Sequence, residues 1–215
     1  MIIATAKSKV YTLCAGINPT LIAPAFIDIG TNNTEKRNDP FYMGVNHPRI
    51  EQKDYDQYMN QWIKKLKKHY PHIYLHWEDF GVNNARRFLN QYRNQLCTFN
   101  DDIQGTGAVA LATLLAATKA LGTELGHQRI VLFGAGTAGI GIIEQINQAM
   151  KKIGLKHSEQ QFWCLDRHGL LTQQSPDLNP GQKPFARNAN EVKNWPRDAA
   201  GQINLLTTVE QVKPT

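Results

Sequence analysis

A glycine-rich turn between a short apolar strand and a helix constrains the fold of this chain more than any other feature. Residues 129–133 (Arg-Ile-Val-Leu-Phe) have the composition of a strand, and residues 134–139 read Gly-Ala-Gly-Thr-Ala-Gly. Residues 138–152 then carry apolar side chains at helical spacing, and a second apolar run at 162–165 ends at Asp166. This order predicts an α/β fold containing a Rossmann-type βαβ unit. In such a unit the glycines let a pyrophosphate approach backbone N–H groups at the amino end of the helix.

The candidate cofactor ligands lie in this turn and at the end of the second strand. They are Gly134, Ala135, Gly136, Thr137, Ala138, Gly139, Asp166 and Arg167. An acid at the end of the second strand suits the 2′-hydroxyl of a ribose. Arg167 is suited to a 2′-phosphate, but Asp166 would repel that phosphate, so the sequence favours NAD over NADP.

Two acidic pairs precede this unit. Glu78-Asp79 follow an apolar run at 73–77 that is rich in strand formers, and Asp101-Asp102 follow an amphipathic helical pattern at 85–96. The helix lets the chain turn back and bring both pairs to one site, where four carboxylates would repel one another without a cation. Such oxygen ligands suit Mg²⁺ or Mn²⁺. The alternative, more frequent for a single acidic pair, is helix N-capping with charge that favours the helix dipole.

These motifs resemble those of the malic enzymes. Glu78-Asp79-Phe80 followed by Cys-Thr-Phe-Asn-Asp-Asp-Ile-Gln-Gly-Thr at 97–106 is the most specific match. Shorter runs that resemble the family lie at 11–12, 14–17, 28–33, 39–44, 134–136 and 166–171. The resemblance implies the end part of a malic-enzyme N-terminal catalytic domain, with parallel strands and helices, at residues 1–104. The first part of a Rossmann-type NAD-binding domain would follow at residues 105–215.

The resemblance also implies an activity, that of an NAD-dependent malate dehydrogenase (decarboxylating), which forms pyruvate and CO₂ from malate. In the family pattern Lys7 is the general base supported by Asp101, and Glu78, Asp79 and Asp102 hold the divalent metal. From the residues alone, Lys7 would be an ordinary surface lysine in a polar run.

Two alternatives remain beside that activity. A malolactic enzyme, a close relative that shares nearly all of these motifs, would form lactate and CO₂. A catalytically silent nucleotide-binding remnant is the other alternative, because the chain resembles only the middle of a malic enzyme. The tyrosine that acts as general acid in the family is not matched, so we expect the activity of this chain to be impaired or absent.

Composition narrows the classes of function and of cellular compartment that fit this chain. The net charge of +6 is moderate, and its clearest source, the lysine-rich run at 64–68, closes a predicted helix at 55–70 and forms a solvated face. Nucleic-acid binding is therefore not expected. The 3 cysteines include no Cys-x-x-Cys pair, which indicates reduced thiols in a cytoplasmic protein. The family resemblance suggests a homo-oligomer.

Two apolar runs carry further expectations about the fold. Residues 21–29 predict a buried strand that leads into a turn. Residues 108–121 are too short to span a bilayer and predict a buried helix, so no membrane association is expected. Beyond Leu171 the chain is rich in Gln, Asn and Pro and predicts a long loop.

Overall fold

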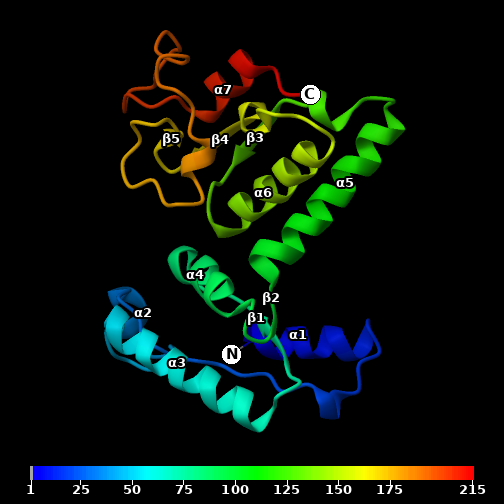
Figure 1. The fold of residues 1–215 in the computed structure, drawn as a ribbon. Helices are drawn as coiled ribbons and strands as arrows, with labels where there is room; N and C mark the ends of the chain where they lie inside the picture. Colours follow the sequence, from blue (N-terminus) through cyan, green and yellow to red (C-terminus); the bar gives the residue numbers. More distant parts are fainter. Residues whose placement is uncertain (1) are drawn as a thin grey trace. The chain divides into compact units, whose positions relative to one another are not determined.

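The computed structural model describes residues 2–215, and it leaves out the side chains of Ile2, Val82 and Asn83. The chain forms two compact units, Met1–Ile73 and Tyr74–Thr215, each of which is described by itself (Figure 1). These units are separated by their internal contacts, whereas the domain boundary at 104/105 was expected from the family resemblance. That boundary stays a prediction.

The first unit is mainly helical. Its helices are α1 (Ile2–Leu13), the 3₁₀ turn η1 (Pro19–Leu21), α2 (Thr34–Asn38) and α3 (Gln52–His69). Helix α3 confirms the predicted helix at 55–70, and it buries Tyr55, Met59 and Ile63, which are four residues apart and share one face. Its last turn carries Lys67, Lys68 and His69, where positive charge favours the helix dipole.

The loop between η1 and α3 is fixed by Asp28. Its carboxylate accepts hydrogen bonds from the backbone N–H groups of Gly30 (2.8 Å) and Val45 (2.7 Å), and these bonds lower the pKa of Asp28. Gly30 has a φ of +80°, and a side chain there would meet His47. The run at 28–33 therefore has a structural role in this unit.

The prediction of a buried strand at residues 21–29 is wrong. Among the described residues, this segment forms no sheet and its side chains are mostly exposed. Pro24 has no N–H to donate to a strand ladder. At the end of the run, the Ile50 N–H donates to the Ile29 carbonyl (3.0 Å), and just after it the Thr31 N–H donates to the His47 carbonyl (3.0 Å). The apolar run is thus an extended connection.

The second unit begins with a parallel pair of strands. They are β1 (Tyr74–Trp77) and β2 (Cys97–Asn100), joined through helix α4 (Val82–Tyr92). The side chains of Trp77, Phe88 and Tyr92 are all buried, and their ring centroids are 6.0 Å apart in each pair. Helix α4 therefore packs back on β1, as the amphipathic pattern at 85–96 predicts. A turn of π-helix, η2 (Asp101–Gly105), leads directly into α5 (Thr106–Ala120).

The Rossmann-type βαβ unit follows and confirms the predicted α/β fold. Strand β3 (Ile130–Phe133) is parallel to β4 (Phe162–Asp166), and α6 (Thr137–Lys152) connects them. A short strand, β5 (Gly169–Leu170), adds antiparallel to β4. The remaining elements are the 3₁₀ turns η3 (Leu125–His127), η4 (Ser158–Gln161) and η5 (Lys183–Phe185), and helix α7 (Leu205–Val212). The core between α6 and the sheet includes Ile140, Ile143, Met150, Phe162 and Cys164.

Helix α5 is less buried than expected. Gly107 and Thr118 are its only buried residues among those described, whereas Val109 is 68% and Leu115 45% exposed. Apolar residues lie all round this helix, so packing one side on α6 leaves the others uncovered in this chain (Figure 1). Across the described residues, no helix has the length and apolar character needed to cross a membrane.

Candidate active site

The two acidic pairs lie at one edge of the β1–β2 sheet. Because β1 and β2 are parallel, their carboxyl ends meet at the same edge, and Trp77 pairs with Asn100 at the last position of the ladder. Glu78-Asp79 and Asp101-Asp102 therefore leave the sheet side by side. The backbone N–H of Asp79 donates to the Asp102 carboxylate at 3.2 Å. The structure thus brings together the two pairs that the sequence singles out.

The charge of this cluster affects the pKa of Asp102. Partial burial raises the pKa of this carboxyl group, and the negative charges of Glu78, Asp79 and Asp101 raise it further, against the lowering effect of the Asp79 hydrogen bond. Asp79 itself has a φ of +58°, an uncommon conformation for a residue with a side chain. A divalent cation among these oxygens would remove the repulsion, so the donor set fits Mg²⁺ or Mn²⁺.

The turn η2 holds the second pair in place through Asn100, which is fully buried. The Asn100 side-chain carbonyl accepts the Ile103 N–H (3.0 Å), and its backbone N–H donates to the Gln104 side chain (2.9 Å). A Cβ at Gly105 would collide with the Asp101 carboxylate. Only glycine at position 105 therefore leaves room for this orientation of Asp101.

His76 joins the acidic residues, although the sequence did not single it out as a site residue. Candidate ligand atoms of His76, Glu78 and Asp101 all lie within 4.8 Å of one another. The Nε2 atom of His76 is 3.1 Å from a carboxylate oxygen of Glu78. Alternation along a strand places residues i and i+2 on the same face, which is the signal in the sequence that could have identified His76.

The glycine-rich turn is built against the end of β4. The N–H groups of Gly134 and Ala135 both donate to the Leu165 carbonyl, at 3.0 and 2.8 Å. Gly134 has a φ of +108°, and a Cβ at Gly139 would collide with the Gly134 carbonyl. Helix α6 starts at Thr137 directly after this turn, so its first N–H groups have no acceptor within the helix. This geometry can accept a pyrophosphate.

Gln182 is a second residue that sequence reasoning missed. Its buried side chain donates to the Ala135 carbonyl at 2.9 Å and so supports the glycine-rich turn from a distant loop. A lone glutamine in a polar loop gives no signal of this role in the sequence.

Asp166 lies at the carboxyl end of β4, where the ribose partner was expected. One oxygen of its carboxylate accepts the His168 N–H at 2.8 Å. The Arg167 side chain turns to the same neighbour, with its Nε atom 2.9 Å from His168 Nε2. The structure therefore places Asp166 at the predicted position and directs Arg167 toward His168.

Helix α6 connects the glycine-rich turn with the acidic turn. The Gln145 side-chain amide donates to the carbonyls of Gln104 (2.8 Å) and Ile103 (3.4 Å), both in η2. At Gly141, a Cβ would come within 2.7 to 3.1 Å of the Ile103 backbone. Helix α6 thus approaches η2 closely, and both predicted ligand sites contact this one helix.

Lys7 belongs to the other compact unit. It lies in the middle of α1 and is partly buried, whereas Asp101 belongs to the unit Tyr74–Thr215. The pairing of Lys7 with Asp101 stays a prediction.

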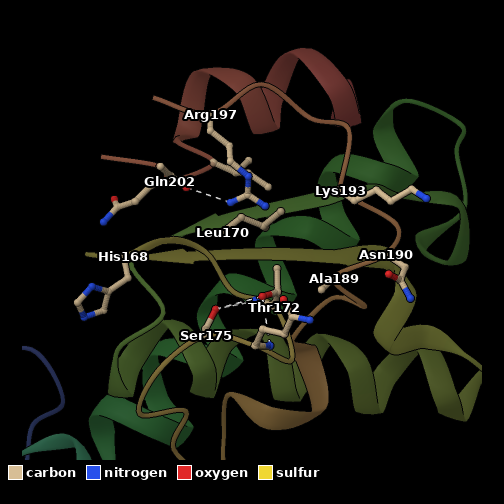
Figure 2. Close-up of a pocket in the computed structure, with 12 residues that line it drawn as sticks. His168, Leu170, Thr172, Ser175, Ala189, Asn190, Lys193, Arg197 and Gln202 are labelled. Atoms are coloured by element: carbon tan, nitrogen blue, oxygen red, sulfur yellow. Dashed lines mark hydrogen bonds between the residues drawn. The ribbon is translucent and has the colours of Figure 1, made fainter. Parts of the chain in front are cut away.

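A separate depression of about 360 Å³ lies beyond the end of β4 (Figure 2). It is lined by Leu170 of β5 and mainly by polar residues of the loops that follow, such as Thr172, Ser175 and Asn190. Arg197, on its border, donates to the Gly201 carbonyl at 3.0 Å. None of the residues predicted from the sequence lines this depression, but His168, which does, is hydrogen-bonded to Asp166 and Arg167.

The βαβ unit with its glycine-rich turn places the chain in the class of α/β proteins with a Rossmann-type nucleotide-binding fold. Residues 103–215 match the family model described as malic enzyme, NAD binding domain. Residues 1–93 match the model described as malic enzyme, N-terminal domain. The chain therefore belongs to the malic enzyme family, which confirms the resemblance found in its motifs.

Individual relatives agree with this assignment. The chain is 47% identical to NAD-dependent malic enzyme 3 of Bacillus subtilis, over 99% of this chain and 38% of that protein. It is 43% identical to an NAD-dependent malic enzyme of Pectobacterium carotovorum, over 97% of this chain and 37% of that protein. The crystal structure of an NAD-dependent malic enzyme from Thermotoga maritima has the same fold, with a TM-score of 0.54 and 23% identity over 76% of this chain and 40% of that one. The chain thus spans about 38% of the length of the first of these relatives.

Proposed function

We propose that this chain carries the central part of a malic-enzyme active site, which serves the oxidative decarboxylation of malate to pyruvate and CO₂. The observation that carries the proposal is the meeting of Glu78-Asp79 with Asp101-Asp102 at the carboxyl edge of β1 and β2. Ligands of α/β sheets bind at this edge. The membership of the chain in the malic enzyme family supports the choice of reaction.

Glu78, Asp79 and Asp102 would hold a divalent cation, Mg²⁺ or Mn²⁺. When bound, the cation supplies Lewis-acid polarisation of the substrate carbonyl and charge stabilisation of the enolate that remains when CO₂ leaves. The residues of the chain preorganise this site, because the Asp79 N–H fixes the Asp102 carboxylate and Gly105 leaves space for Asp101. The pKa of Asp102 is raised first by partial burial and then by the negative charge of Glu78, and a bound cation would offset the second of these effects.

NAD would bind at residues 134–139, with its pyrophosphate at the amino end of α6 and a ribose hydroxyl at Asp166. Exposed N–H groups and the helix dipole favour the pyrophosphate, and the Asp166 carboxylate suits a hydroxyl and repels a 2′-phosphate. The names of the relatives, NAD-dependent malic enzymes, support NAD as the cofactor.

Lys7 would remove the proton of the malate hydroxyl, and the Asp101 carboxylate would support it. A lysine acts as a base only in its neutral form, so this role requires a lowered pKa at the assembled site. The family motif around Lys7 supports this role.

Calorimetry with the purified chain tests the proposal. We expect Mn²⁺ to bind and NAD to bind, and Glu78→Gln to weaken Mn²⁺ binding by at least about tenfold with NAD binding unchanged. The matched control is Glu210→Gln, which changes an exposed acid of α7. Absence of binding for both ligands contradicts the proposal.

A turnover assay with malate, Mn²⁺ and NAD then tests the reaction. We expect NADH to form slowly or not at all in this chain, and any NADH that forms should disappear with Lys7→Ala. Lactate without net NADH would instead establish the malolactic reaction.

A further inference from the structure

The depression beyond β4 lies on the face of the sheet opposite α6. Successive residues of a strand face opposite sides of the sheet. Leu170 of β5 packs with Val192 and Ile203, whereas the next residue, Leu171, packs in the core beneath α6. Leu170 and Ile203 also line the depression. It is therefore open on the side of the sheet away from the helix that follows the glycine-rich turn.

The lining of the depression combines positive charge with neutral hydrogen-bonding groups. Figure 2 shows Lys193 and Arg197 on one side of Leu170, and Thr172 and Ser175 on the other. The neutral polar residues of the lining are Thr172, Gln174, Ser175, Asn190 and Gln202. The described residues that line the depression include neither Asp nor Glu. Such a lining repels cations and attracts anions.

The acids nearest to these cations in the sequence are engaged elsewhere. The Glu191 carboxylate accepts a hydrogen bond from Arg187 at 2.5 Å. One oxygen of the Asp198 carboxylate accepts two backbone N–H groups of its own turn, at 3.0 and 2.9 Å. Within the part of the chain that the structure describes, neither Lys193 nor Arg197 forms an ion pair with a carboxylate. Their charges are therefore available to a bound anion.

Hydrogen bonds hold both walls of the depression in place. Arg197 donates from one guanidinium nitrogen to the Gly201 carbonyl at 3.0 Å, which leaves N–H donors on its other nitrogens. On the opposite wall, the Ser175 oxygen accepts the Thr172 N–H at 2.9 Å, which orients the hydroxyl group. Polar groups that are already ordered lose less entropy when a ligand binds.

We propose that this depression binds a small phosphorylated sugar, with the phosphate at Arg197 and Lys193. A guanidinium and an ammonium group suit the phosphate oxygens, and the hydroxyls and amides of Thr172, Ser175 and Asn190 suit the hydroxyls of a sugar. The described lining contains no Phe, Tyr or Trp side chain, which disfavours a nucleotide base. The volume of about 360 Å³ is that of a small-molecule site.

This site neighbours the proposed cofactor site but does not depend on it. The His168 N–H donates to the Asp166 carboxylate at 2.8 Å, and His168 also lines the depression, whereas Asp166 does not. The inference goes beyond the proposed function, since it requires neither a bound cation nor turnover of malate. A phosphate at this place could also come from the 2′-phosphate of NADP, so the test must separate a sugar phosphate from the cofactor.

Calorimetry with the unmodified chain tests the ligand class. We expect glucose 6-phosphate or glycerol 3-phosphate to bind at least about tenfold more tightly than inorganic phosphate, because the hydroxyls add hydrogen bonds. Glucose should give no heat. Saturating NAD should change the affinity for the sugar phosphate by less than about threefold. Absence of binding for both phosphate compounds overturns the inference, as does equal binding of glucose. Loss of sugar-phosphate binding with NAD would assign the depression to the cofactor site and also overturn it.

Two variants test the placement of the phosphate. We expect Arg197→Gln to weaken sugar-phosphate binding by about tenfold and Lys193→Gln by at least about threefold, since both side chains are exposed and their charges are partly screened. Arg93→Gln, which changes an exposed arginine at the end of α4, is the matched control and should bind as wild type. NAD and Mn²⁺ binding by each variant reports on its folding. A chain that loses both cations and still binds the sugar phosphate would overturn the inference, and the proposed function would stand because its ligands lie elsewhere.

Discussion

The pKa of Asp102 reflects its position among the acidic residues Glu78, Asp79 and Asp101. Its pKa is raised above the ordinary value of 3.8, first by partial burial and then by the charge of Glu78. The folded state therefore holds this proton more tightly than the unfolded chain. Without a divalent cation, the free energy of unfolding should fall as the pH rises from about 3.8 through the raised pKa of the folded state, and the loss persists at neutral pH.

We predict that Asp102→Asn raises the urea midpoint of the cation-free chain at pH 7 and leaves it unchanged at pH 3.5 or below. The corresponding gain in the free energy of unfolding should stay below about 1 kcal/mol, because solvent screens a partly exposed carboxylate. Urea unfolding in the presence of a chelator measures both midpoints. A variant that is less stable than wild type at pH 7 would show that the cluster does not destabilise the empty site.

The three cysteines differ in a way that only the structure reveals. Cys164 is buried in the core of the Rossmann-type unit, and burial raises its pKa to about 12. Cys14 and Cys97 are exposed. We predict that iodoacetamide at pH 8 modifies two thiols in the native chain and three in urea, because alkylation requires an accessible thiolate. Mass spectrometry counts the adducts, and rapid triple labelling of native chain would contradict the burial of Cys164.

At the scale of elements, the contact between α6 and η2 is the feature that joins the two sites. Gln145→Ala removes the donor to the Gln104 and Ile103 carbonyls. We predict a loss of about 1 kcal/mol in the free energy of unfolding and weaker Mn²⁺ binding, since the turn that carries Asp101-Asp102 loses its support. Chemical denaturation and calorimetry measure the two effects. Gln148→Ala, an exposed glutamine of the same helix, is the control, and equal effects in both variants would mean that the bond has no special role.

Elements with a regular apolar pattern were predictable from the sequence, and those that depend on neighbours were not. The βαβ unit and α3 carry their own period, so local residues determine them. The run at 21–29 has the composition of a strand but finds no partner strand among the described residues. Helix α5 is apolar all round, so its sequence does not tell which side is covered. Burial and pairing are tertiary properties, and propensity gives only a weak prior for them.

In the candidate site too, some residues could be predicted from the local sequence and others could not. The acidic pairs were recognisable because Glu78-Asp79 follows a run of strand formers and a helical pattern separates it from Asp101-Asp102. The strand β2, which was not predicted from the sequence, pairs with β1 in parallel and brings the two acidic pairs together. The roles of Gln145 and Gln182 depend on backbone carbonyls of other segments, and no motif marks these two residues. Register across a sheet and contacts between helices must be known before such residues can be assigned.

At the scale of the whole molecule, the proposed reaction needs residues of both compact units. The proposed metal and nucleotide ligands lie in Tyr74–Thr215, whereas Lys7 lies in α1 of Met1–Ile73. Ligands that bind only the folded state stabilise it by about 2.7 kcal/mol at a concentration of 100 times Kd. Local protection from hydrogen exchange then shows which elements each ligand stabilises.

We predict a different exchange pattern for each ligand. NAD should slow exchange at the start of α6 and the end of β4, and Mn²⁺ should slow it in η2. If Lys7 meets the substrate, malate together with Mn²⁺ should also protect α1. Lys7→Ala should abolish that protection, whereas Lys9→Ala, an exposed lysine of the same helix, should retain it. If malate with Mn²⁺ slows hydrogen exchange in η2 but leaves exchange in α1 unchanged, Lys7 does not belong to the site. A base that contacts the substrate should be stabilised when the substrate binds.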